Sequence, residues 1–477
     1  MELEFWYSLA AFLVPLASLL ASCHAILGKR DHRSALTWVA LHWLVPVFGV
    51  ILYLLFGINR IRVRASNLYA PGMRREDVSD RCTDGELQEA LQRDAIHLTS
   101  LARAVDRISA RPLVAGNQVD YLVDGEEAYP AMLATIRSAR HSVTLATYIF
   151  GNDHVGRDFA TALQAAVERG VAVRVLIDNA GERYTWPSMV GNLRRRGVPV
   201  ARFFPRFPAR LIGMNLRNHR KLLVVDGRIG FTGGMNIRRH HRMDSGRKAA
   251  RDIHFRLRGP VVRHLQDVFF EDWYFAAGER LEGEAFFPAT LGRAGDVIAR
   301  GLRGGPDENL LKHHWAMHSA IASARYSLRV MTPYFLPDAT MITALNLASM
   351  RGVQVDIVLP SHSNLPFVHW AMMAQIRQLL DYDCRIWLTP RPFDHTKLML
   401  VDDHWTFLGS SNWDPRSLRL NFEFNVECFD YQLATSLAAR VDTRIGNARR
   451  LGRSDLDRLA LPLKLRNGVA RLMMPYL

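Results

Sequence analysis

The chain has 477 residues, 49% of them hydrophobic and 22% charged, a composition typical of globular protein and a length sufficient for two or three domains. The 61 lysines and arginines outnumber the 46 acidic residues, and the resulting net charge of +15 favours phosphate-bearing partners, either nucleic acid or an anionic bilayer. The cysteines Cys23, Cys82, Cys384 and Cys428 are scattered without metal-ligand spacing, which argues against a disulfide framework and a zinc site.

Two apolar stretches, residues 5–27 and 35–57, begin the chain, and neither contains Asp, Glu, Lys or Arg. Each is long enough to cross a hydrocarbon core of about 30 Å as a helix. Neither shows the polar face of an ordinary core helix. Glu2 and Glu4 precede the first stretch where a cleaved signal peptide carries positive charge. We therefore predict a transmembrane helical hairpin in residues 1–65, followed by a linker or juxtamembrane segment in residues 66–115.

Basic residues flank both apolar stretches and predict their orientation. The connecting loop carries Lys29, Arg30 and Arg33, and the segment after the second stretch carries Arg60, Arg62, Arg64, Arg74 and Arg75. By the positive-inside rule, both ends of the hairpin lie in the cytoplasm by a narrow margin. This predicts a multi-pass membrane protein whose remaining domains are on the cytoplasmic side.

Beyond about residue 110, short β-branched runs alternate with helical patterns, as in VTLATYIF, DFATALQAAVERG and VAVRVLIDN. Such alternation is typical of β-α-β units around a buried sheet. The pattern is repeated, because residues 139–147 match residues 324–332 in order and in type. We therefore predict two similar α/β domains, residues 116–290 and 300–477, joined within the Gly- and Pro-bearing stretch 281–306.

Each of these halves contains one copy of the same polar motif, H-x-K-x4-D-x6-G. In both copies the histidine and lysine stand two residues apart on a predicted strand, so their side chains emerge on one face. A short turn and a second strand then bring an asparagine and a glycine or serine alongside. The residues of the two copies are His219, Lys221, Asp226, Gly234 and Asn236, and His395, Lys397, Asp402, Ser410 and Asn412.

These residue types suit the chemistry of phosphate esters. Lysine, asparagine and the Gly234 or Ser410 positions can bind non-bridging oxygens as charge develops. A neutral histidine can attack phosphorus, and a second histidine can protonate the departing alkoxide, so one site needs both motifs. Asp226 and Asp402 lie at strand ends, and we expect them to support the catalytic motif structurally. Lysine is not a usual metal ligand, so no metal is predicted.

The motifs are those of the phospholipase D superfamily, and the chain resembles its bacterial cardiolipin synthases in particular. The resemblance covers nearly the whole chain, including the apolar N-terminal region, NHRKLLVVDGRIGFTGGMN, TPYFLPD and DPRSLRLNFEFNVE. It implies two α/β domains related by a pseudo-twofold axis, with both histidines at their interface and no cofactor. It also implies an inner (cytoplasmic) membrane location.

In that family a carboxylate beyond each motif orients the imidazole. Glu423, in LNFEFN, matches this position in the second half. In the first half the like-for-like spacing from His219 leads to Arg247, so Asp252, in ARDIHF, is the candidate. Each carboxylate is thus expected to hold the histidine of its own half. A carboxylate that accepts the Nδ1–H bond fixes the tautomer and presents Nε2 to phosphorus.

The resemblance implies a phosphatidyltransferase that makes cardiolipin and glycerol from two molecules of phosphatidylglycerol through a phosphatidyl-histidine, most simply on His219. Its partners would be phosphatidylglycerol, other anionic phospholipids and the membrane, without nucleic acid. The near-symmetric motifs do not separate the roles of the two histidines or fix an oligomeric state. A hydrolytic phospholipase D and, from a different class, a phospholipase D-type nuclease are the alternatives. Tyr148, Tyr334 and Phe335 are expected to pack in the core more than to line a lipid entrance.

Overall fold

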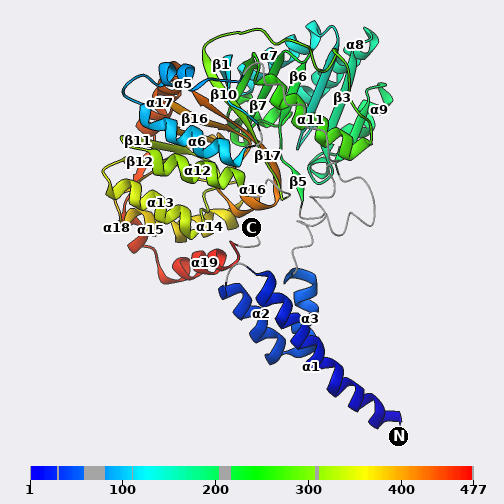
Figure 1. The fold of residues 1–477 in the computed structure, drawn as a ribbon, viewed down its shortest axis with the longest axis vertical. Helices are drawn as coiled ribbons and strands as arrows, with labels where there is room; N and C mark the ends of the chain where they lie inside the picture. Colours follow the sequence, from blue (N-terminus) through cyan, green and yellow to red (C-terminus); the bar gives the residue numbers. More distant parts are fainter. Residues whose placement is uncertain are drawn as a thin grey trace. The chain divides into compact units, whose positions relative to one another are not determined.

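The computed structural model describes residues 2–29, 32–57, 81–109, 111–203, 216–306 and 311–474. It separates into two units, Met1–Asn67 and Leu68–Leu477 (Figure 1). Residues 66–80 of the predicted juxtamembrane segment lie outside the described residues. So do the arginines that the orientation argument used after the second apolar stretch, Arg60, Arg62, Arg64, Arg74 and Arg75.

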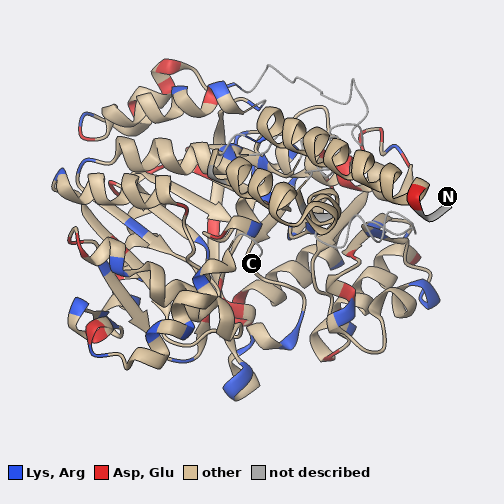
Figure 2. Cartoon of the chain, turned by 90° about the horizontal axis from the view of Figure 1, so that it is seen from below, with Lys and Arg blue, Asp and Glu red and all other residues tan. Residues whose placement is uncertain are grey.

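The first unit begins with one uninterrupted helix, α1 (Glu2–Gly28). After Glu4 the helix carries no Asp, Glu, Lys or Arg, and its ribbon is tan in Figure 2. Its large apolar side chains, Trp6, Leu20 and Leu27 among them, are exposed along its length. Within the described residues α1 is the one helix that is long and apolar enough to cross a membrane, over Glu4–Gly28.

The second predicted span is not a continuous helix, so the prediction of a two-span hairpin is wrong in this respect. Helix α2 (His32–Leu44) ends before Val45, and α3 (Pro46–Leu52) is followed by a π-helical turn (Tyr53–Gly57). Pro46 has no N–H group, and its ring disfavours helical geometry at Val45, whose φ is −138°. The sequence analysis counted apolar residues and did not weigh this proline.

The second unit contains one mixed sheet in which two similar halves are arranged about a central antiparallel pair, β1 and β10. Outward from β1 the order is β9-β7-β6-β2-β3-β4, and outward from β10 it is β17-β16-β15-β11-β12-β13, followed by β18. This matching order on both sides confirms the predicted fold class, two similar α/β halves with pseudo-twofold symmetry. The first half has β1 (Val114–Val123), β2 (Ser142–Thr147), β3 (Ala172–Asp178), β4 (Val200–Phe203), β5 (Arg217–Asn218), β6 (Leu222–Val225), β7 (Ile229–Gly233), β8 (Ala250–Arg251) and β9 (Ile253–Arg258); the second has β10 (Val297–Gly304), β11 (Ser327–Met331), β12 (Gln354–Pro360), β13 (Arg385–Thr389), β14 (Phe393–Asp394), β15 (Leu398–Val401), β16 (Trp405–Gly409), β17 (Asn421–Phe429) and β18 (Arg449–Leu451).

Helices cover the sheet, and each half has its own hydrophobic core. Strands β2 and β17 are buried along their whole length, because neighbouring strands and helices cover them, and such strands read as continuous runs of apolar residues in the sequence. The helices of the first half are α7 (Asp124–Ser138), α8 (His154–Glu168), α9 (Met189–Arg195) and α11 (Val262–Ala277), and those of the second are α12 (Lys312–Ser323), α13 (Ala339–Met350), α14 (Pro366–Gln375), α15 (Arg377–Leu380), α16 (Pro415–Arg419), α17 (Tyr431–Gly446), α18 (Arg453–Asp457) and α19 (Leu461–Leu472).

Two further helices, α5 (Asp84–Leu91) and α6 (Thr99–Ile108), lie in the segment that the sequence analysis describes as a linker. A capping box between Thr83 and Glu86 begins α5. Leu91 and Val105 are fully buried in the same core cluster as the second half. These helices therefore pack as part of the catalytic unit, while the exact limits of the two domains stay a prediction.

Each motif histidine directly follows a short strand that pairs with a strand of the opposite half. Strand β5 pairs in parallel with β17, and β14 pairs in parallel with β8. The backbone N–H of His219 donates to the carbonyl of Phe422 (2.8 Å), and that of His395 donates to Arg251 (2.8 Å). The histidines and lysines therefore lie just before β6 and β15, not inside those strands as predicted, because their backbone is bonded across the interface.

Candidate active site

A cavity of about 540 Å³ lies between the two halves, and residues from both halves line it. His219 and His395 both face this cavity, as do the motif asparagines Asn236 and Asn412. The duplicated motifs thus form one site, as the chemistry of two histidines requires.

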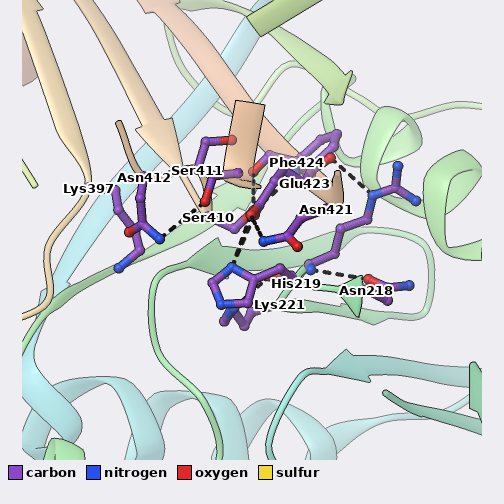
Figure 3. A network of polar contacts seen from close by, with 12 residues as sticks. Asn218, His219, Lys221, Lys397, Ser410, Ser411, Asn412, Asn421, Glu423 and Phe424 are labelled. Carbon is purple, nitrogen blue, oxygen red and sulfur yellow. Dashed lines mark hydrogen bonds and ion pairs between the residues drawn. The ribbon is translucent and has the colours of Figure 1, made fainter. Parts of the chain in front are cut away.

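The first half-site is built around the contact of His219 with Glu423. The Nδ1 atom of His219 lies 3.2 Å from Glu423 Oε2, and it must donate because a carboxylate accepts. Glu423 is fully buried and also accepts from the hydroxyl of Ser410 (2.5 Å) and the amide of Asn421 (3.1 Å), as Figure 3 shows. This tautomer leaves the Nε2 lone pair of His219 available to a substrate.

The second half-site is built around the contact of His395 with Asp252, whose Oδ2 lies 2.9 Å from His395 Nδ1. Asp252 is buried and accepts one further hydrogen bond, from the backbone N–H of Ile253 (2.9 Å). Gly234 stands where the other half has Ser410, and a Cβ atom there would lie 2.5 Å from Asp252 Oδ2. Asp252 therefore has no hydroxyl donor equivalent to Ser410.

The pairing of carboxylates with histidines is the reverse of the prediction. Each carboxylate holds the histidine of the opposite half, because β5 and β14 place each histidine beside the other half's strand. The sheet register shows that the carboxylates are equivalent. Gly233 lies opposite His254 and Gly409 lies opposite Asn425, so Asp252 and Glu423 occupy the same position in β8–β9 and β17.

The motif lysines are buried, and each donates a hydrogen bond from Nζ to the carbonyl of its own motif histidine. These distances are 2.5 Å for Lys221 to His219 and 2.5 Å for Lys397 to His395. Burial lowers the pKa of Lys221 to about 7 and that of Lys397 to about 8, against the opposing charges of Glu423 and Asp252. A bound phosphate would favour the charged form of both.

Burial also lowers the pKa of both histidines, to about 4 for His219 and well below the ordinary value for His395. The two carboxylates differ. Burial acts to raise the pKa of Glu423, but His219, Lys221 and the hydrogen bond from Ser410 outweigh it and hold the pKa below its usual value. Burial raises the pKa of Asp252 well above the usual value for an aspartate. Glu423 is therefore the stronger holder of negative charge.

The motif carboxylates lie at turns on the far side of the motif strands. Asp226 accepts hydrogen bonds from the backbone N–H groups of Arg140, His141 and Ser142. Asp402 does the same for Arg325, Tyr326 and Ser327, and also contacts His97 Nε2 at 2.7 Å. These contacts tie each motif strand to the start of β2 or β11, in keeping with structural support.

Of the residues predicted to bind phosphate, the two asparagines line the cavity, whereas Gly234 and Ser410 do not. Asn236 accepts from the N–H of Ile149 through Oδ1 (3.0 Å), and Asn412 donates to Ser417 through Nδ2 (3.2 Å). Both line the cavity. Gly234 and Ser410 are buried behind the orienting carboxylates, so their contacts do not support the predicted phosphate contact.

Several cavity residues were not identified from the sequence. The ring of Tyr148 lies 5.1 Å from that of His219, that of Tyr334 lies 6.5 Å from His395, and that of His241 lies 5.7 Å from His395. Tyr148 and Tyr334 thus line the cavity, while Phe335 is core as expected. Basic side chains complete the wall: Arg217, Arg238, Arg247, Lys248, Arg391 and Arg416. The nearness of four of them to motif residues in the sequence could have indicated them, namely Arg217, Arg238, Arg391 and Arg416.

Among the residues that the structure describes, two groups of side chains bring metal-ligand atoms within 4.8 Å of one another. One, His241, Asp252 and His395, is part of the cavity, and an ion there would replace the hydrogen bond between His395 and Asp252. The other is His314, His318 and Asp338, where Asp338 already accepts from His314 (2.9 Å) and caps α13. In each group one histidine and the carboxylate are already hydrogen-bonded to each other, His395 with Asp252 and His314 with Asp338.

The two similar α/β halves, and the two H-x-K motifs that meet in one cavity, define the phospholipase D class of protein. The family model described as "Cardiolipin synthase, PLD-like domain" matches residues 132–273 and 317–445, and the model "Phospholipase_D-nuclease N-terminal" matches residues 16–57. The chain belongs to this cardiolipin synthase family.

Relatives of known name match it almost from end to end. Cardiolipin synthase 1 of Staphylococcus epidermidis is 30% identical over 94% of each chain, and the major cardiolipin synthase of Bacillus subtilis is 30% identical over 94% of this chain and 95% of its own. The crystal structure of a phosphatidylserine synthase from Haemophilus influenzae shares the fold, with a TM-score of 0.63 at 15% identity over 79% of this chain and all of that one. With the long apolar helix α1, these relatives show a membrane protein.

Proposed function

We propose that the chain is a cardiolipin synthase, a phosphatidyltransferase that joins two phosphatidylglycerol molecules into cardiolipin and releases glycerol. One observation supports this most strongly. Two histidines, each held at Nδ1 by a buried carboxylate of the opposite half, face a single cavity whose wall also carries basic and amide side chains. Such a site serves a phosphodiester that is first broken and then re-formed.

In the first step, Nε2 of His219 attacks the phosphorus of one phosphatidylglycerol. A P–N bond forms as the P–O bond to the glycerol headgroup breaks. His395 donates a proton to the departing alkoxide, so glycerol leaves neutral. Lys221, Lys397, Asn236 and Asn412 surround the phosphate and stabilise the oxygens that gain charge.

In the second step, a second phosphatidylglycerol takes the place of glycerol. His395 now accepts the proton of its terminal hydroxyl, whose oxygen attacks phosphorus. The P–N bond breaks, cardiolipin forms and His219 regains its lone pair. Atoms and protons balance over the cycle without a further reactant.

The unlike carboxylates support this division of roles. Glu423 accepts three side-chain hydrogen bonds and stays ionised, so it holds the hydrogen of His219 on Nδ1. Burial lowers the pKa of His219 and keeps the ring neutral, which leaves the Nε2 lone pair free. Asp252 has fewer donors, and burial raises its pKa, so the pair Asp252 and His395 holds one more proton. A proton on Asp252 leaves His395 with its hydrogen on Nε2, in the form that a general acid needs.

The third part of the proposal concerns the membrane topology of the chain. We propose that the catalytic unit faces the cytoplasm at the inner membrane and that the protein is multi-pass, with residues 35–57 entering the bilayer as the broken helix pair α2 and α3. A single crossing by α1 gives the same side for the catalytic unit, because Glu2 and Glu4 lie in its first turn and Lys29 follows its end. Labelling of cysteines introduced at either end of α1 in intact cells distinguishes the two topologies.

The function is tested with detergent-purified protein and phosphatidylglycerol labelled in the glycerol headgroup and in an acyl chain, with and without EDTA. Equimolar release of glycerol and formation of cardiolipin, insensitive to EDTA, is the expected result. Phosphatidic acid as the sole lipid product would replace the proposal with a hydrolytic phospholipase D. Cleavage of oligonucleotides without turnover of lipid would indicate the nuclease alternative.

A further inference from the structure

Helix α19 (Leu461–Leu472), close to the C-terminus, lies on the catalytic unit with most of its surface exposed. Among its residues Asn467 and Ala470 are buried, whereas Leu461, Leu465 and Leu472 are 67%, 61% and 73% exposed. Exposed leucines so close together are unusual on a water-facing surface. The helix sits beside α14 (Figure 1), which it packs against.

Cations lie among these leucines. Lys464 and Arg471 are exposed on the same helix, and Arg466 lies over the ring of Trp370 in α14, 4.4 Å from its centroid. Lys464 contacts only a backbone carbonyl, that of Asp457 (2.7 Å), among the described residues. Helix α19 itself carries no acidic residue. A helix with exposed leucines and cations has the properties of a segment that lies at the surface of an anionic bilayer.

The neighbouring helix α14 connects this surface to the catalytic cavity. Leu365 and Val368, at the beginning of α14, line the cavity, while Leu365 and Phe367 are also exposed to the outside. Exposed apolar side chains therefore lie both at the cavity wall, on α14, and on α19, which packs against α14. We call the side chains Leu365, Phe367, Leu461, Leu465, Val469 and Leu472 the α14–α19 face.

The cavity volume makes such a surface necessary for a two-tailed substrate. A cavity of about 540 Å³ is of the size that holds one drug-sized ligand. It can take the reacting head groups, but the acyl chains of two phospholipids must remain outside. Apolar side chains next to the opening lower the cost of moving a head group from the bilayer into the cavity, because the chains need not cross water.

We propose that the α14–α19 face docks onto the anionic lipid surface and sets the opening of the cavity against the bilayer, so that substrates enter without leaving it. The inference rests on the proposed function for the identity of the substrates. The docking itself does not depend on which lipid reaction follows. Because α1 anchors the chain independently, loss of the face should impair delivery of substrate and leave the chain in the membrane.

The first experiment measures docking directly. A polarity-sensitive NBD label is placed at Leu465→Cys, in full-length protein in which Cys23 and Cys82 are replaced by serine, and the protein is reconstituted in nanodiscs containing phosphatidylglycerol. We expect a blue-shifted emission and quenching by doxyl-labelled lipids. The same label at Gln432→Cys, an exposed position on α17, should show neither.

Quenching at position 465 equal to that at position 432 would overturn the proposal. A blue shift without lipid quenching would also overturn it, by showing that protein, either α1–α3 or a second copy, covers the face.

The second experiment measures the consequence for turnover. The double variant Leu461→Asp with Leu465→Asp is expected to lose about tenfold or more in activity on vesicles and less than about twofold in mixed detergent micelles, where lipid is delivered by exchange. Leu347→Asp, a half-exposed leucine on α13, is the matched control. An equal loss in vesicles and micelles would contradict the proposal. If the wild-type protein forms no cardiolipin but the label at position 465 is quenched by lipid, the proposed function fails and the docking face stands.

Discussion

The two half-sites share one backbone plan but differ in the groups that surround each histidine. His219 is held by Glu423, which also accepts from Ser410 and Asn421. His395 is held by Asp252, which has Gly234 where a serine could donate. The two halves therefore hold their histidines in the same way but surround the two carboxylates with different hydrogen-bond donors.

The difference shows how a symmetric fold can support an asymmetric reaction. A nucleophile needs a free lone pair, whereas its partner needs a proton at the start of the cycle. In the reaction proposed above, the donors around Glu423 favour the first state at His219, and the buried Asp252 with few donors favours the second at His395. The crossed pairing also makes each half-site depend on both halves.

The largest effect is expected from removing each histidine in turn. Both His219→Ala and His395→Ala should lower cardiolipin formation by about 10⁴-fold or more. A phosphatidyl ester with a p-nitrophenol leaving group separates the roles, because this group departs without a general acid. With it, His395→Ala should still form a covalent phosphatidyl-enzyme in a single turnover, and His219→Ala should not.

His154→Ala, an exposed histidine at the start of α8, is the control and should keep full activity. Labelled covalent intermediate on the His219→Ala protein would reverse the assignment of the two histidines.

The second prediction concerns the crossed carboxylates. Glu423→Gln should reproduce the defect of His219→Ala, because an amide that donates to Nδ1 moves the hydrogen of His219 onto Nε2 and removes the nucleophilic lone pair. Asp252→Asn should reproduce the defect of His395→Ala, because an amide cannot pass a proton to Nδ1 when His395 donates its own. Each loss should lie between about 10² and 10⁴-fold. The p-nitrophenol ester in single-turnover experiments again reports which histidine is affected. If Glu423→Gln spares intermediate formation and Asp252→Asn blocks it, the carboxylates serve their own halves and the observed pairing has no catalytic meaning.

Much of this fold could be predicted because its signals are local and repeated. The H-x-K phrases around His219 and His395, and the matched segments 139–147 and 324–332, indicated two halves and one shared site. The apolar runs of the sheet followed from burial on both faces. Glu423 and Asp252 could be identified as carboxylates beyond each motif.

What could not be predicted depends on contacts between distant strands. The exchange of Glu423 and Asp252 between halves follows from the pairing of β5 with β17 and β14 with β8, which no local pattern encodes. The break at Pro46 was a local signal, but hydropathy alone does not weigh it. The hydrogen bond from Ser410 to Glu423 likewise became visible only in the structure, because the sequence analysis predicted that Ser410 binds phosphate.

The third prediction uses the lysines, which differ little between the halves. Both are expected to act in the charged form, and their pKa values of about 7 for Lys221 and about 8 for Lys397 mean that charge is lost as pH rises through that range. In kcat/KM, which reports the free enzyme, activity should fall by roughly tenfold per unit between about pH 7 and 8, and by roughly a hundredfold per unit above about pH 8, where both lysines lose their charge. No acid limb is expected down to about pH 5, because His219 has a pKa of about 4 and stays neutral there.

Lys221→Arg and Lys397→Arg should move this alkaline fall to higher pH, since a guanidinium keeps its proton. Lys312→Arg, at the start of α12 and outside the cavity wall, is the control. An alkaline limb that both motif variants leave unmoved would assign it to other groups.

The smallest effect is expected at the far ends of the two motifs, where the halves differ in stability and not in chemistry. Asp402 accepts from His97 Nε2 (2.7 Å), with both side chains buried, whereas the contacts of Asp226 in the first half are to backbone N–H groups. His97→Ala should therefore lower the free energy of unfolding by about 1.5–3 kcal/mol, through loss of a hydrogen bond to a buried carboxylate. His141→Ala, beside Asp226, should change it little, because its backbone N–H is retained and its side chain is exposed. Urea unfolding in detergent measures both, and turnover per folded molecule should stay at the wild-type level in both. A loss of turnover in His97→Ala protein that remains folded would mean that the segment before the first half acts on the second half-site through Asp402, and the two halves would then differ in control as well as in stability.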